Sequence, residues 1–156
     1  MIISPDEGGM GRAIYMANVM GLDMGMFYKR RDYTKIVNGR NPIVAHEFLG
    51  SSVEGKDVII VDDMIDTAGT ICMAADMLME KGAKSVRAAI THPILSGQAY
   101  EKINASALQE VIVTDTIPLN PEKDLSKFKV MTVADIFANV IERVHNYKEI
   151  SSIFFK

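Results

Sequence analysis

The chain has 156 residues, of which 48% are hydrophobic and 24% are charged, and its formal net charge is -3. This length gives one domain with one sizeable core, and the charge lacks the basic excess of a nucleic-acid-binding protein. No apolar run approaches the roughly 20 residues of a membrane span, and the N-terminal residues lack the regions of a signal peptide. With a single cysteine, Cys72, that cannot form an intrachain disulfide, we expect a cytoplasmic protein without a nucleic-acid or membrane partner.

The first third of the chain alternates between apolar strands and a helix. A short strand is expected over residues 2–4, a helix over 11–20 that Gly21 ends, and a second strand over 24–28. Residues 32–42 are polar, contain Asn-Gly and Asn-Pro, and predict a mobile loop or an exposed hairpin. An antiparallel or edge strand is expected over 43–49.

The remainder continues the alternation. Strands are expected over 58–61, 85–91, 111–114 and 129–132, and helices over 70–81, from 96 to about 104, and over 134–146. The last helix is expected to bury Ile136, Phe137, Val140, Ile141 and Val144, and the apolar tail over 150–155 is expected to dock on the body or on a neighbour. Strands separated by helices predict an α/β fold with a mostly parallel sheet flanked by helices.

The most specific motif runs from residue 58 to residue 70. A buried strand is followed by Asp62 and Asp63, then by a loop of Asp66, Thr67, Ala68, Gly69 and Thr70 that leads into a helix. Small residues let the backbone approach a phosphate, and the N–H groups at the helix start favour a dianion. The two carboxylates can accept vicinal sugar hydroxyls, directly or through a divalent cation. An isolated acidic pair is more often a helix cap, but the full string resembles the phosphoribosyl diphosphate motif of the type I phosphoribosyltransferase fold.

Two further groups fall at expected strand ends. Asp6 follows the first strand, where its carboxylate either caps the next helix or binds Mg²⁺ in the same crevice. Lys29 and Arg31 share one face at the end of the second strand, and such cations stabilise the charge of a transferring phosphoryl group. A run of three bases is otherwise a solvated edge. His92, also near a strand end, could reach the crevice, but such a residue is more often a turn residue with satisfied hydrogen bonds.

Together these segments resemble one family. Residues 4–9, 29–31, 62–70, 91–97, 114–118 and the closing Ser-Ser-Ile-Phe-Phe occur in the order and spacing of the C-terminal half of ribose-phosphate diphosphokinases, also called phosphoribosyl pyrophosphate synthetases. The resemblance covers the whole chain. It implies that residues 1–156 form a single three-layer αβα domain of the type I phosphoribosyltransferase kind, equivalent to the C-terminal domain of a two-domain synthetase.

The resemblance also implies a reaction and its participants. ATP, as co-substrate, donates its diphosphoryl group to the anomeric hydroxyl of ribose 5-phosphate, with Mg²⁺ required and inorganic phosphate often an activator. Lys29 and Arg31 match the catalytic cations, and Asp6 matches a Mg²⁺ ligand. Asp62 and residues 66–70 match the ribose 5-phosphate loop, with Asp63 beside them. The family forms hexamers, so a homo-oligomer is expected.

Three functions remain open at this point. Family members are about twice as long as this chain, and the absent half carries the adenine pocket, so we expect ribose 5-phosphate or phosphate binding with little or no ATP turnover by this chain alone. One alternative is a phosphoribosyltransferase acting on a nucleobase, although no base-recognition segment is evident. The other is a non-catalytic subunit associated with a synthetase, which a damaged cation pair or sugar loop would favour, yet both are intact.

Overall fold

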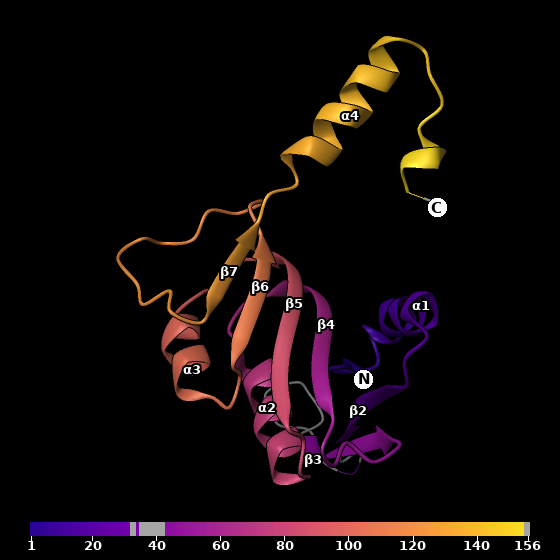
Figure 1. Ribbon diagram of the computed structural model, residues 1–156. Coiled ribbons are helices and arrows are strands. Elements are labelled where there is room, and N and C mark those ends of the chain that lie inside the picture. The colour runs from indigo at the N-terminus through magenta and orange to yellow at the C-terminus, as the bar shows by residue number, and fades with distance from the viewer. Residues whose placement is uncertain (32–33, 35–42, 155–156) are drawn as a thin grey trace.

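A single sheet forms the centre of the molecule. The computed structural model describes residues 1–31, 34 and 43–154, with side-chain surroundings described for these residues except 29–31 and 43–45. Within that part of the chain the strands follow the order β3-β2-β1-β4-β5-β6-β7 (Figure 1). They are β1 (Ile2–Ser4), β2 (Met24–Arg31), β3 (Ile43–Gly50), β4 (Asp57–Ile65), β5 (Ser85–Pro93), β6 (Glu110–Thr114) and β7 (Phe128–Met131). Neighbours are parallel except β2 and β3, which pair antiparallel.

Helices cover both faces of this sheet. The structure has α1 (Met10–Met20), α2 (Gly69–Glu80), α3 (Ala99–Ala105), α4 (Ala134–His145) and the 3₁₀ turn η1 (Ser151–Ile153). The larger core joins one sheet face to α2 and α3, and a smaller core joins the opposite face to α1 (Figure 1). The predicted α/β class and three-layer arrangement are therefore confirmed.

Alternation along β4 explains why both faces are apolar. Val58 and Ile60 face the larger core with Leu78 of α2, whereas Val61 faces the smaller core with Ala17 of α1. Successive side chains of a strand point to opposite faces, so a run of β-branched residues without polar interruption suits a strand that is covered on both sides.

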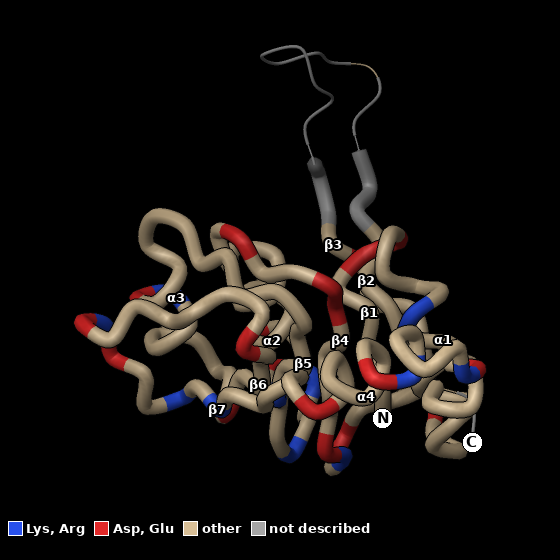
Figure 2. The backbone as a smooth tube through the Cα atoms, turned by 90° about the horizontal axis from the view of Figure 1, so that it is seen from above, with Lys and Arg blue, Asp and Glu red and all other residues tan. Residues whose placement is uncertain are grey.

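The chain reverses its direction of growth across the sheet between β1 and β4. From β1 the chain adds β2 and β3 on one side, then returns to place β4 and the later strands on the other. Ligands of open α/β sheets bind at the carboxyl ends of the strands where this reversal occurs. Figure 2 views the molecule from above, onto this edge, with acidic positions along β4.

Three strands continue well past their expected ends. β2 continues to Arg31, β4 to Ile65 and β5 to Pro93, and the pairing of β4 with β5 includes Asp62 with Ile90 and Met64 with His92. Backbone hydrogen bonding continues past the apolar run because a ladder does not require apolar side chains. Asp62, Asp63 and His92 therefore lie in strands and not in turns. The antiparallel edge strand β3 is confirmed, whereas the loop expected over 32–42 lies outside the described residues except for Thr34.

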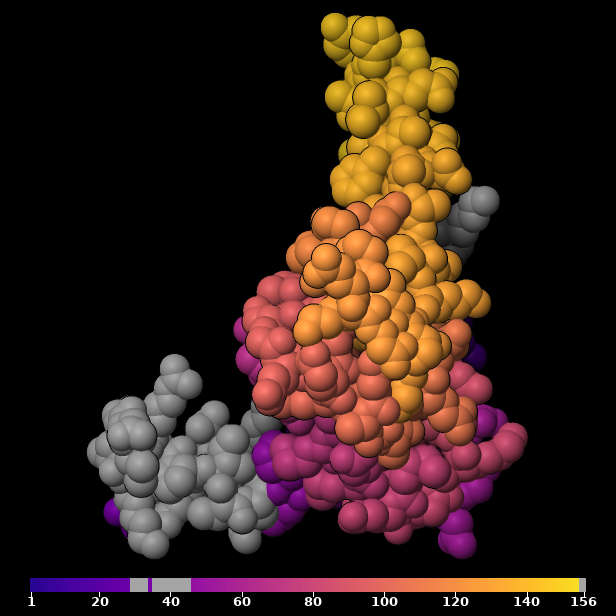
Figure 3. All heavy atoms as spheres, turned by 90° about the vertical axis from the view of Figure 1, so that its left-hand side faces the viewer, coloured from indigo at the N-terminus to yellow at the C-terminus, as the bar shows by residue number. Residues whose placement is uncertain are grey.

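Helix α4 is where predicted but is not buried. It extends away from the sheet (Figures 1 and 3), and none of its residues is buried. The expected burial of its apolar side chains is wrong, since Phe137 is 59% exposed and Ile141 66%. The Asp115 carboxylate accepts a hydrogen bond from the Val133 N–H at 3.0 Å, which fixes the link between β7 and α4. The helix thus leaves along the strand direction instead of turning back over the sheet.

The described part of the tail follows α4. Ile150 and Phe154 remain exposed, and Arg143 of α4 donates to the Glu149 carbonyl at 2.9 Å and to Ser152 Oγ at 3.1 Å. Docking of this segment on the body is therefore wrong for residues 150–154. In the described residues no helix combines the length and apolar character needed to cross a bilayer.

Candidate pentose phosphate site

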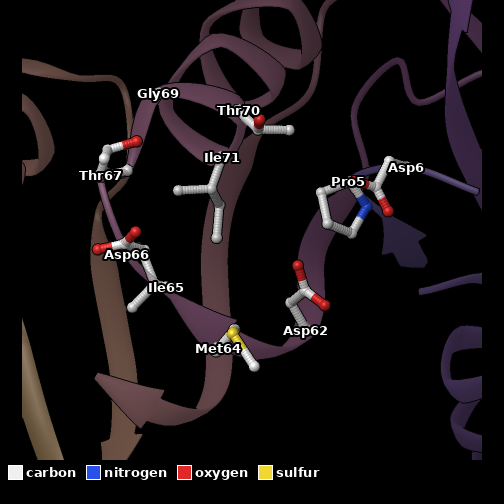
Figure 4. Close-up of a pocket in the computed structure, with 11 residues that line it drawn as sticks. Pro5, Asp6, Asp62, Met64, Ile65, Asp66, Thr67, Gly69, Thr70 and Ile71 are labelled. Carbon is white, nitrogen blue, oxygen red and sulfur yellow. The ribbon is translucent and has the colours of Figure 1, made fainter. Parts of the chain in front are cut away.

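A cavity of about 170 Å³ opens where the chain reverses between β1 and β4 (Figure 4). Three segments form its wall: the turn after β1, the end of β4 and the loop that begins α2. It is lined by Pro5, Asp6, Asp62, Met64, Ile65, Asp66, Thr67, Ala68, Gly69, Thr70 and Ile71. Seven residues predicted from the sequence are thereby brought together: Asp6, Asp62, Asp66, Thr67, Ala68, Gly69 and Thr70.

The carbonyl groups of the loop from Ile65 to Ala68 all accept hydrogen bonds, from the segment before α3, from α3 and from α2. The donors are Leu95 N to Ile65 O (3.0 Å), Ser96 N to Asp66 O (3.1 Å), Lys102 Nζ to Thr67 O (3.2 Å) and Cys72 N to Ala68 O (3.1 Å). In a planar trans peptide the following N–H points opposite to the carbonyl. Successive N–H groups are thus turned away from these partners, as in the concave backbone sites that bind anions.

The start of α2 completes this anion-binding geometry. Ala68, at the N-cap, adopts the left-handed conformation with φ 61°, and no side chain caps the helix. The first N–H groups of a helix have no intrahelical acceptor, and the helix dipole favours negative charge there. The hydroxyls of Thr67 and Thr70 flank the same position (Figure 4). The loop can therefore bind a phosphate group.

Asp6 and Asp62 form the acidic side of the cavity. Asp6 Oδ1 accepts hydrogen bonds from the N–H groups of Gly8 at 3.0 Å and Gly9 at 3.4 Å, and the buried Ser4 Oγ donates to the Asp6 carbonyl at 2.6 Å. The carboxylate of Asp6 thus holds the turn before α1, but it does not cap the helix, because its partners precede Met10 and no side chain caps α1. Asp6 also lines the cavity, and its role as a Mg²⁺ ligand stays a prediction.

Asp62 lies across from Asp6 on β4, and its surroundings perturb its ionisation. Burial raises the pKa of Asp62 above its ordinary value of 3.8, and the charge of Asp63 acts in the same direction. The Asp63 N–H, which donates to Asp62 Oδ1 at 2.9 Å, and the Arg12 guanidinium oppose this rise. A half-buried carboxylate of this kind can accept hydrogen bonds from hydroxyl groups.

Arg12 is a charged residue next to the cavity that was not predicted from the sequence. Its Nη1 lies 2.9 Å from Asp62 Oδ1 and its Nη2 lies 2.9 Å from Asp63 Oδ2. Its position in the sequence could have indicated a role, because a cation in the first turn of a helix opposes the helix dipole and α1 has no acidic residue there to offset it. Such a cation is expected to pair with an acidic residue elsewhere in the chain.

The remaining predicted residues have different outcomes. Asp63 does not line the cavity, and its carboxylate instead binds Arg12. Lys29 and Arg31 lie at the carboxyl end of β2, near the same sheet edge, but their side chains are outside the described part. His92 lies in β5 and not in a turn, and its Nδ1 lies 2.9 Å from Thr116 Oγ1.

The residues present suit Mg²⁺ only together with a phosphorylated ligand. Among the described residues, no group of three or more His, Cys, Asp or Glu side chains could hold a metal by itself. Mg²⁺ is commonly bound by one or two carboxylates, with substrate phosphates and water completing its shell. Asp6 and Asp62, which face the cavity from the turn after β1 and from β4, meet that requirement (Figure 4).

Comparison with known proteins places this chain in a family. Residues 35–155 match the phosphoribosyl synthetase-associated domain. The chain belongs to this family. Its sequence is 49% identical over 154 residues to a ribose-phosphate pyrophosphokinase of Wolinella succinogenes and 41% identical to that of Bacillus subtilis, with 99% of this chain covered in both cases.

A solved structure agrees with the sequence relatives. The phosphoribosylpyrophosphate synthetase of Mycobacterium smegmatis superposes with a TM-score of 0.81 and 33% identity over 94% of this chain. The chain spans about half the length of these family relatives, 47% and 46% of the two sequences and 45% of the crystallised chain. These relatives favour the synthetase over the nucleobase phosphoribosyltransferase.

Proposed function

We propose that this chain supplies the ribose 5-phosphate site of a ribose-phosphate diphosphokinase. The observation that carries the proposal is the pairing, in one cavity, of an anion-binding loop at the start of α2 with the carboxylate of Asp62. A phosphate on the loop leaves the pentose ring directed toward the acidic wall. Vicinal ring hydroxyls are donors that match carboxylate acceptors.

In the proposed reaction the anomeric oxygen of ribose 5-phosphate forms a bond to the β-phosphorus of ATP. The bond between that phosphorus and the α,β-bridging oxygen breaks, AMP leaves, and the hydroxyl proton is released. The loop holds the nucleophile in line, which lowers the entropic part of the barrier. We propose that Lys29 and Arg31 stabilise the negative charge that develops on the transferring group. Asp6, with Asp62, would hold the Mg²⁺, which would neutralise the charge of the phosphates.

The similarity to half of a longer protein bears on activity. Since the relatives are about twice as long, we propose that ATP contacts come from a part that this chain does not contain, and that inorganic phosphate acts as an activator in the complete protein. The expected result for the chain alone is ribose 5-phosphate binding without AMP release. A coupled AMP assay that shows full turnover by this chain would contradict the proposal.

The binding experiment is calorimetric titration with ribose 5-phosphate, inorganic phosphate and ribose. Ribose 5-phosphate is expected to bind more tightly than phosphate, and ribose alone only weakly. Replacement of both acidic residues, Asp62→Asn with Asp63→Asn, removes charged acceptors and is expected to weaken ribose 5-phosphate binding by about tenfold or more. Binding of inorganic phosphate is not expected to weaken.

Asp57 provides a matched control. It begins the same strand, but at the opposite edge of the sheet, where its carboxylate binds Lys84 at 3.1 Å and Ser85 Oγ at 2.5 Å. Asp57→Asn should leave the affinity for ribose 5-phosphate unchanged. Equal affinities for ribose 5-phosphate and phosphate in the unaltered chain, or an unaffected double variant, would refute the pentose assignment.

We also propose that the protein is a homo-oligomer located in the cytoplasm. Support for self-association comes from the exposed apolar stripe of α4, since contiguous exposed apolar surface marks interaction sites. A cytoplasmic location suits the single free Cys72, which is buried and unpaired. Light scattering of the chain beside Phe137→Glu tests the first point, with a smaller species expected for the variant and an unchanged mass contradicting it.

A further inference from the structure

Arg12 links α1 to both carboxylates of the acidic pair. The Arg12 side chain starts from the first turn of α1, which follows the segment that carries Asp6. Each of its two terminal nitrogens lies 2.9 Å from a different carboxylate. The guanidinium is a rigid planar fork, so two such contacts fix the relative positions of the two acceptors. Lysine, a single point charge, cannot make the same pair of contacts.

The contacts also set the rotation of the Asp62 carboxylate. Arg12 Nη1 and the Asp63 N–H, both at 2.9 Å, bind the same oxygen, Oδ1. With one oxygen held by two donors, the carboxylate plane is fixed and Oδ2 becomes the acceptor for a ligand. In Figure 4 the Asp62 side chain rises from β4 into the cavity, on the side of Pro5 and Asp6.

Charge gives a second reason for the arrangement. Adjacent carboxylates repel one another, and partial burial strengthens that repulsion because less water screens it. The side chains of Arg12, Asp62 and Asp63 are 35%, 25% and 50% exposed, so the cluster is only partly solvated. Arg12 offsets the repulsion and keeps both groups available as charged acceptors.

Arg12 itself is not among the residues that line the cavity. It lines instead a neighbouring hollow of about 250 Å³, between α1 and β7, to which Asp62 also contributes. Any influence on a ligand in the pentose phosphate cavity therefore passes through the carboxylates.

We propose that Arg12 is a positioning residue that sets the preference of this site for a pentose phosphate over a simple phosphate. This inference rests on the proposed function, because it assumes that the acidic pair accepts the ring hydroxyls. The hydrogen bonds and ion pairs of Arg12 go to Asp62 and Asp63 and not to the phosphate loop, so the two parts of the ligand depend on different residues. Loss of Arg12 removes the contribution of the ring and spares that of the phosphate.

A purely structural role is the alternative, in which Arg12 only fastens α1 to the sheet. That role predicts lower stability on replacement, with equal effects on every ligand. The ratio of the dissociation constants of ribose 5-phosphate and inorganic phosphate separates the two explanations, because a merely structural ion pair does not change it.

The experiment measures this ratio by calorimetry for the unaltered chain, Arg12→Met, Arg12→Lys and Arg87→Met. Arg12→Met is expected to lower the preference for ribose 5-phosphate by about tenfold or more, with phosphate affinity unchanged. Arg12→Lys should restore part of the preference, because it keeps charge without the fork. Arg87 is the matched control, because its Nε forms an ion pair with Glu110 Oε2 at a distance of 3.8 Å and the pair lies away from the cavity. Replacement of Arg87 should leave the ratio unchanged.

Adding Arg12→Met to the Asp62→Asn, Asp63→Asn chain gives an independent measure. With Asp62→Asn and Asp63→Asn already present, Arg12→Met should have no further effect on the ratio, since residues acting as one unit are not additive. An unchanged ratio in both Arg12 variants would overturn the inference, and Arg12→Lys alone decides it if Arg12→Met does not fold. If the unaltered chain shows no preference for ribose 5-phosphate, the proposed function fails first, which is a distinguishable result.

Discussion

Gly9 joins the turn that carries Asp6 to the start of α1, where it is the N-cap residue. A methyl group placed on Gly9 would lie 2.7 Å from Ser4 Oγ, 3.5 Å from Arg12 Nη1 and 3.6 Å from Asp62 Oδ1. The backbone of Gly9 has φ -84° and ψ -6°, which alanine adopts without strain. The effect of Gly9→Ala is therefore steric and is centred on Ser4.

The size of this effect follows from the surroundings of Ser4. The residue is 0% exposed, and its hydroxyl donates to the Asp6 carbonyl at 2.6 Å. An extra methyl in a packed interior costs about 1–3 kcal/mol. Ser4→Ala removes the obstructing oxygen and costs about 0.5–1.5 kcal/mol for the lost hydrogen bond. With the obstruction gone, the double variant should be destabilised by little more than Ser4→Ala alone.

Urea unfolding of the four proteins gives the coupling energy directly. Gly11→Ala is the control, because a methyl at Gly11 meets nothing within 4 Å and the position lies inside α1. That variant should gain about 0.5–1 kcal/mol. The reasoning is refuted if Gly9→Ala is as harmless as Gly11→Ala, or if the effects of Ser4→Ala and Gly9→Ala simply add to within about 0.5 kcal/mol.

Three further results are expected. Because burial raises the pKa of Asp62, the folded state keeps a proton that the unfolded chain has released. The stability of the unaltered chain relative to Asp62→Asn should therefore fall as pH rises from 3.8 through the folded pKa. A difference in urea unfolding that does not change with pH would contradict this. Leu78→Ala, at a side chain 0% exposed, should lower the free energy of unfolding by about 2–5 kcal/mol. Ile141→Ala on α4, at a side chain 66% exposed, should change it by no more than about 0.5 kcal/mol. Similar losses for the two variants would show that α4 packs on the body. Burial also raises the pKa of the Cys72 thiol, so a thiol reagent should label Cys72 only after unfolding, and rapid labelling of the native chain would speak against its burial.

Local pattern was sufficient for the central part of the fold. The β-branched run before Asp62 and the small residues after Asp66 specify a strand, a turn and a helix in succession, and β4 and α2 lie there. The order of strands and helices then leaves few arrangements, because parallel crossovers are right-handed. The cavity residues could be predicted for the same reason, since strand ends of a parallel sheet meet at one edge.

Features that depend on distant contacts could not be predicted in this way. The expected helix start near Ser96 is displaced to Ala99, because the Ser96 N–H binds the Asp66 carbonyl and Gly97 has φ 60°. The apolar period of α4 indicates a face to be covered but does not specify what covers it. The ion pair of Arg12 with Asp62 joins residues 50 positions apart, and only their placement in space shows that they meet.

The detachment of α4 has a consequence for how the molecule opens. A helix of 12 residues without a packed face is marginal in water, while β4, β5 and α2 share the larger core. Amide hydrogens of α4 should therefore exchange with solvent at the rate of local fraying, whereas those of the central strands should exchange only when the whole body unfolds. Protection of the α4 amides on assembly would then report, residue by residue, the moment at which this helix acquires a partner.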